Sequence, residues 1–61
     1  MKIGDIFLDK KSNDLLIFSG AMWVNEFIRT TYYLKFETKY GAFLYMSTDS
    51  ARETLEVIGA L

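Results

Sequence analysis

Side chains that could act as nucleophiles are few in this chain, because it contains four serines but neither cysteine nor histidine. A serine attacks a substrate only when a neighbouring base takes its proton, and here only a lysine or a carboxylate could serve. The four serines lie among residues typical of turns, bends and helix caps: Ser12, Ser19, Ser47 and Ser50. Structural roles account for all of them. We therefore expect no catalytic residue and no enzyme.

Three carboxylates, Asp5, Asp9 and Asp14, gather around the first expected turn. Acids grouped in this way can bind Mg²⁺ or Ca²⁺ or transfer protons. Lys10 and Lys11 lie between them and oppose cation binding, and the spacing matches no calcium loop. Without cysteine or histidine, a structural zinc site is excluded as well. We expect no metal and no cofactor, and we interpret this segment as a solvated turn.

Aromatic side chains make up 16% of the sequence and concentrate between Trp23 and Tyr45. Tyrosine, tryptophan and arginine are enriched at the anchoring positions of protein-binding surfaces. We predict a partner-binding surface whose aromatic anchors and orienting cations are Trp23, Tyr33, Phe43 and Tyr45 with Arg29 and Lys35. The docking element is this aromatic sheet face or an exposed strand edge, and the partner is another protein or a second copy of the chain. The plainer explanation is that the aromatic side chains fill the core of a thin barrel.

The mixture of aromatic rings and cations is also typical of small barrels that bind single strands. Such a face could hold Arg29, Tyr33, Lys35, Lys39, Tyr40, Phe43 and Tyr45. The net charge of −1 and the nearby Glu26 and Glu37 oppose this interpretation. Single-stranded nucleic acid is therefore the alternative to a protein partner.

A length of 61 residues allows a single domain, residues 1–61. A chain this short buries only about 60% of the surface that its unfolded form exposes, yet 51% of its residues are apolar. That excess predicts a homodimer or a higher oligomer. The interspersed charges and the absence of a long apolar run indicate no membrane partner, and the absence of cysteine fits a cytoplasmic protein. The small size is typical of accessory or inhibitor proteins encoded by phages and other mobile elements.

Runs of alternating or continuous apolar residues predict four strands, at residues 3–8, 15–24, 27–37 and 42–47. The second strand is apolar on both faces, which predicts burial on both sides. The Ser19-Gly20 pair within it predicts a bulge or a sharp bend. Turn-forming residues separate the strands at 9–14, 25–26 and 38–41.

The end of the chain changes to helical spacing, with apolar positions at Ala51, Leu55 and Ile58. Ser50 and Glu53 fit a capping box, so about ten residues of helix are expected to dock on the sheet. The predicted fold is therefore mainly β (α+β). It is a small, strongly bent antiparallel sheet, an SH3-like partial barrel of four to five strands, with one C-terminal helix.

Overall fold

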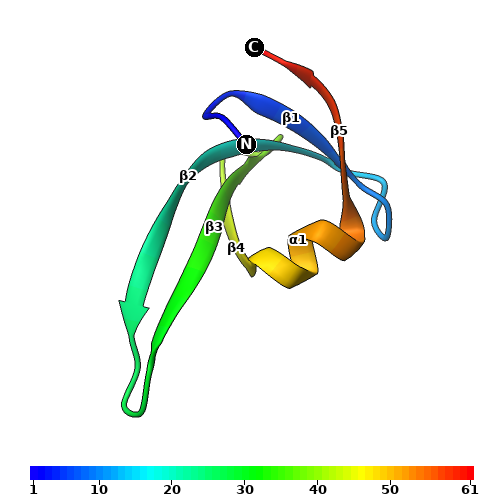
Figure 1. Cartoon of the computed structure of the whole chain (residues 1–61). Helices are drawn as coiled ribbons and strands as arrows, with labels where there is room; N and C mark the ends of the chain where they lie inside the picture. Colours follow the sequence, from blue (N-terminus) through cyan, green and yellow to red (C-terminus); the bar gives the residue numbers. More distant parts are fainter.

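The computed structural model describes residues 1–61 as one open antiparallel sheet of five strands with one short helix (Figure 1). In chain order the elements are β1 (Asp5–Asp9), β2 (Leu15–Asn25), β3 (Thr30–Thr38), β4 (Phe43–Ser47), α1 (Thr48–Thr54) and β5 (Leu55–Ala60). The order in the sheet is β4-β3-β2-β1-β5, so β4 and β5 are its edges and α1 connects them. This confirms a mainly β fold with bent strands. The helix is not long and apolar enough to cross a membrane.

The turns form where the sequence favours them. After β1, the Asp9 carboxylate accepts a hydrogen bond from the Lys11 amide at 2.9 Å, and Asn13 takes a positive φ of 63°. After β3, Gly41 adopts a φ of 80°, and the Ala42 carbonyl accepts a hydrogen bond from the Thr38 amide at 2.8 Å. The loops predicted at residues 9–14 and 38–41 are therefore confirmed. Asparagine and glycine occupy their left-handed positions because they tolerate this backbone better than other residues do.

A bulge in β2 reverses which side chains point into the core. The register with β3 shifts between Phe18 and Gly20, and Gly20 has a φ of 128°. Ahead of the bulge Phe18 lies opposite the buried Phe36, whereas beyond it Trp23 lies opposite Tyr32 on that same face. The expected bulge is therefore present. Simple alternation along the strand predicts that Phe18, Met22 and Val24 share one face, and this is wrong, because one extra residue flips the alternation.

The core consists of seven buried apolar residues, which lie around Phe36: Phe7, Leu16, Phe18, Leu34, Phe36, Ala51 and Leu55. The Phe36 side chain is completely buried, and the rings of Phe7 and Phe18 each lie 5.6 Å from it, centre to centre, edge to face. β2 is buried only near its start. The prediction that it is buried on both sides throughout is wrong, because no layer covers the half beyond the bulge.

The C-terminal helix is shorter than its sequence pattern predicts. Its N-cap is Ser47, whose side-chain oxygen accepts a hydrogen bond from the Ser50 amide at 3.1 Å, and the helix ends at Thr54. The next six residues form β5, which pairs antiparallel with β1 from Asp5↔Ala60 to Asp9↔Leu55. The prediction of a terminal helix of about ten residues is thus wrong. β-branched residues favour a strand here, and β1 offers them an unpaired edge.

Candidate protein-binding arm

The far halves of β2 and β3 form a two-stranded ribbon that we call the arm, residues 21–32. β1 pairs with β2 only as far as Ile17, and β4 pairs with β3 only from Tyr33 onward. Beyond these points the two strands pair only with each other, from Trp23↔Tyr32 to Asn25↔Thr30. The arm therefore projects from the body of the molecule, towards the lower left of Figure 1. The whole molecule measures 35 × 20 × 19 Å.

Cross-strand pairing assigns the side chains of the arm and of β4 to two faces. Residues opposite each other in an antiparallel pair point to the same side of the sheet. Pairs such as Met22↔Tyr33 and Lys35↔Tyr45 lie on the side away from the core. We call this the outer face, with the residues Met22, Val24, Tyr33, Lys35, Phe43 and Tyr45. The opposite side, which we call the core face of the arm, carries Trp23 and Tyr32.

The structure brings four of the six predicted partner-binding residues together. Tyr33, Lys35, Phe43 and Tyr45 share the outer face. Trp23 lies on the core face, so it does not join them; the flip at the bulge explains this. Arg29 lies in the turn at the end of the arm rather than within a strand, because β3 begins only at Thr30 and not at the predicted residue 27.

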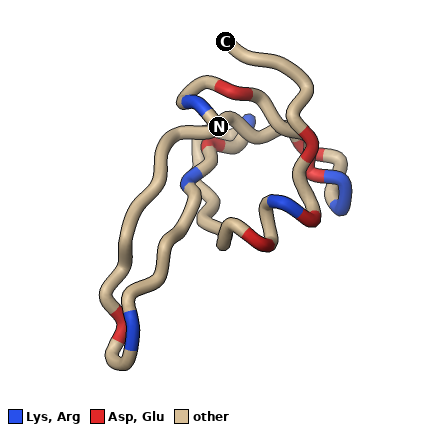
Figure 2. Tube along the Cα trace, in the orientation of Figure 1, with Lys and Arg blue, Asp and Glu red and all other residues tan.

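A shallow depression lies in the outer face. Its lining consists of Met22, Val24, Tyr33 and Tyr45, and its volume is about 270 Å³. All four lining residues are hydrophobic, and the nearest stretches of both strands, residues 21–25 and 30–34, carry no Lys, Arg, Asp or Glu (Figure 2). An uncharged hollow of this kind accepts an apolar side chain without desolvating an ion.

The tip of the arm exposes two large apolar side chains. Phe27 has an exposed fraction of 104% and Ile28 one of 85%. They are the most exposed large hydrophobic residues of the protein apart from Leu61. The sequence pattern predicts a strand from residue 27 and does not indicate them as anchors, whereas β3 begins only at Thr30. The Asn25-Glu26 pair predicts a turn just before them, but Asn25 is the last residue of β2 and the turn extends over residues 26–29.

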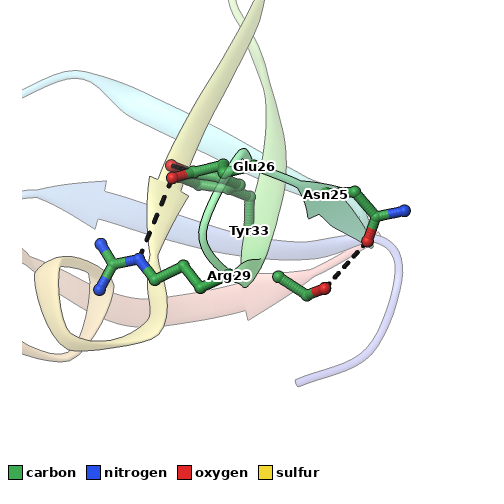
Figure 3. Close-up of polar contacts among 5 residues, drawn as sticks. Asn25, Glu26, Arg29 and Tyr33 are labelled. Carbon is green, nitrogen blue, oxygen red and sulfur yellow. Dashed lines mark hydrogen bonds and ion pairs between the residues drawn. The ribbon is translucent and has the colours of Figure 1, made fainter.

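Polar contacts fix the turn of the arm (Figure 3). The Glu26 amide donates to the Arg29 carbonyl at 2.7 Å, and the Glu26 carboxylate lies 4.0 Å from Nε of Arg29. The Tyr33 hydroxyl donates to the same carboxylate at 3.2 Å, and the Thr30 hydroxyl donates to the Asn25 side chain at 2.9 Å. These contacts are exposed and individually weak. Together they fix the direction in which the tip presents its apolar side chains.

The aromatic side chains are held in place although they are exposed. On the core face, Trp23 is 68% exposed and its ring lies 4.7 Å from that of Tyr32, with the planes tilted by 50°. On the outer face, Nζ of Lys35 lies 4.1 Å from the centre of the Phe43 ring. Rings that are already ordered lose little conformational entropy when a partner covers them.

Serine and aspartate side chains that could have done chemistry take structural roles instead. Ser47 caps α1, the Ser12 side chain accepts a hydrogen bond from the Asp14 amide at 3.4 Å, and Asp9 accepts bonds within its own turn. Lys39 belongs to the face predicted for single-stranded nucleic acid, but it lies in the β3–β4 turn. Its Nζ is 3.6 Å from the Asp14 carboxylate and 5.1 Å from the centre of the Tyr40 ring. This turn is at the other end of β3 from the arm.

Comparison of the chain with protein-family models, with curated proteins and with solved structures finds no match.

Proposed function

We propose that this protein is a small non-enzymatic protein-interaction module, which docks onto a protein through the tip and the outer face of its arm. The observation that carries the proposal is the pair Phe27 and Ile28, which bury almost nothing in their own chain. Soluble monomers seldom expose contiguous large apolar groups unless a partner covers them. Aromatic anchors close to an apolar hollow are the usual centre of such interfaces.

The proposed fold for this module is an SH3-like partial barrel. Three features support it: the strand order β4-β3-β2-β1-β5, the bulge at Gly20 and the helix that links the two edge strands. A bent β2 lets one strand serve two halves of a curved sheet. The free edge of β4, which contains no charged residue in Phe43–Ser47, is a second surface where an extended segment of a partner could add.

The alternative is a module that binds single-stranded nucleic acid through the same outer face. One observation favours it: Nζ of Lys35 lies over the ring of Phe43, so this face offers a cation beside a ring on which a nucleobase could stack. Against it, Arg29 is the only basic residue of the arm, and its positive charge is already paired with the carboxylate of Glu26. Binding of phosphates needs several unmatched cations. We therefore rank this function second.

Photo-crosslinking from the tip of the arm tests the proposal. A benzophenone amino acid would replace Phe27 in the living source cell, and Tyr40 in a matched control. Tyr40 is 82% exposed in the β3–β4 hairpin, so both probes are open to solvent. We expect discrete protein adducts from position 27 that are absent from position 40. Their loss on Ile28→Ser would show that the apolar tip makes the contact.

Three results of the photo-crosslinking would contradict the proposal. Identical adducts from both positions would mean that any exposed ring on this protein reacts with its surroundings. No protein adduct from position 27 would remove the arm as a docking element. Adducts with nucleic acid in place of protein would promote the alternative function.

A further inference from the structure

The arm combines an apolar projection at its tip with an apolar hollow on its outer face. Phe27 projects at the tip, and the uncharged depression of about 270 Å³ lies towards the body, lined by Met22, Val24, Tyr33 and Tyr45. Phe27 follows Met22 by five positions, of which the last two lie beyond the end of β2 at Asn25, so the separation is at most on the order of 15 Å. A surface that carries both halves of a contact, separated along one line, can bind a copy of itself across a two-fold axis.

We infer that the partner of the arm is a second copy of this chain; this rests on the proposed function above and specifies it. The two arms lie antiparallel, outer face against outer face. Phe27 of each copy enters the depression of the other, and the two-fold axis passes near Val24. The contact is reciprocal, so it closes as a dimer and leaves no site open for a third copy.

The exposed area is sufficient for a stable dimer. The apolar side chains that would be covered are Met22, Phe27, Ile28, Phe43 and Tyr45, with exposed fractions of 42, 104, 85, 51 and 48%. With about 200 Å² for each large side chain, they expose on the order of 600 Å² per copy. A standard interface buries about 800 Å² per partner, of which little more than half is apolar. The arm therefore supplies enough apolar surface.

The charges of the arm allow two copies to approach. Glu26 and Arg29 are its only ionised residues, and they have opposite signs, so the arm has no net charge and does not repel itself. The Arg29 side chain is 72% exposed. In the antiparallel arrangement its guanidinium comes to the tyrosine-lined depression of the second copy, where it can lie over the rings of Tyr33 and Tyr45. Arg29 thus orients the contact without an unpaired buried charge.

Trp23 lies on the core face of the arm, away from this contact, and is the only tryptophan in the chain. Its fluorescence therefore reports which face is covered. Association through the outer face leaves the emission wavelength of Trp23 unchanged. Association through the core face would bury its ring and shift the emission to the blue.

Sedimentation equilibrium from micromolar to millimolar concentration tests the dimer, with charged substitutions at the two ends of the contact. We expect the wild type to sediment at twice the chain mass of 7.1 kDa. Met22→Lys and Phe27→Asp should each raise the dissociation constant by about tenfold or more, because each buries an unpaired charge. The double variant should regain much of the affinity, because the two-fold axis places the new lysine of each copy beside the new aspartate of the other copy. The control variant Tyr40→Ser, in the β3–β4 hairpin, should dimerise like the wild type.

Three results would overturn the inference. They are a wild type that stays monomeric up to millimolar concentration, a double variant that associates no better than the two single variants, and a blue shift of Trp23 emission on association. Both substituted side chains are exposed, and circular dichroism verifies that each variant is folded. If the wild type is monomeric while position 27 crosslinks to a different protein, the proposed function stands and only the second copy is excluded.

Discussion

Gly20 determines where the arm points and which aromatic residues it presents. The bulge at this position puts Trp23 on the core face and moves Met22 and Val24 to the outer face. A φ of 128° is accessible to glycine at no cost and is rarely adopted by residues with a Cβ atom. The space around it is open, with no atom within 4 Å of an added Cβ. Any cost of substitution is thus backbone strain and not collision.

We expect Gly20→Ala to lower the free energy of unfolding by about 1–3 kcal/mol, the usual cost of a strained backbone conformation. Gly59→Ala is the matched control, because Gly59 also has open space around it but no positive φ. It should change stability by about 0.5 kcal/mol or less. Urea denaturation followed by circular dichroism, at one fixed protein concentration, measures both. Equal effects of the two substitutions would contradict a strain at Gly20.

Residue types predicted the bulge but not its consequence for the site. A glycine after a serine inside an apolar run signals a bulge whatever the rest of the chain does. Whether the alternation flips depends on the pairing of β2 with β3, which is a long-range property. Tyr33, Lys35, Phe43 and Tyr45 could be placed together because β3 and β4 pair without a shift. Trp23 could not, because the bulge lies between it and the core.

At the scale of elements, the final segment contains two competing patterns. Leu55 and Ile58 are three apart and fit one face of a helix. The segment Leu55–Ala60 also contains adjacent β-branched residues, which favour a strand. Local sequence cannot decide between them, because a short helix and a short strand are both marginal alone. The free edge of β1 decides, since pairing there satisfies backbone groups on both strands.

Two alanine substitutions separate the strand from the helix. In the strand, Leu55 is 9% exposed and belongs to the core, whereas Ile58 is 52% exposed. Leu55→Ala should therefore cost about 2–5 kcal/mol, and Ile58→Ala about 1 kcal/mol or less. Thermal or urea unfolding gives both values. If the two substitutions are equally costly, the side chains share one buried helix face, and β5 is wrong.

At the scale of the whole molecule, apolar surface exceeds what the fold can hide. Seven residues are buried, while fifteen large hydrophobic residues are exposed. The excess predicted from the composition is thus present, and much of it lies on the arm and β4. Charge shows no such excess, because acidic and basic residues are interspersed along the chain (Figure 2). Binding of a partner would therefore be driven mainly by burial of apolar groups and not by attraction between charges.

We expect no measurable binding of single-stranded DNA or RNA at about 150 mM salt, where charges separated by more than about 8 Å are largely screened. Fluorescence anisotropy with labelled mixed-sequence oligonucleotides makes the measurement, and the double variant Arg29→Ala with Lys35→Ala is the control. Micromolar affinity that falls steeply with salt and disappears in the double variant would reverse the ranking of the two functions, because phosphate contacts release counterions.

The pairing of β1 with β5 determines when the protein can finish folding. β1 is made first, but one of its two neighbours is the strand made after all the others, and the Leu61 amide donates to the Gly4 carbonyl at 2.9 Å beside it. At a synthesis rate of about 5–20 residues per second, β1 waits for seconds with an unpaired edge. Leu55, which completes the core, arrives equally late. The nascent chain therefore passes through a stage in which β1 has an unpaired edge, and chaperones that cover such edges would act on it then.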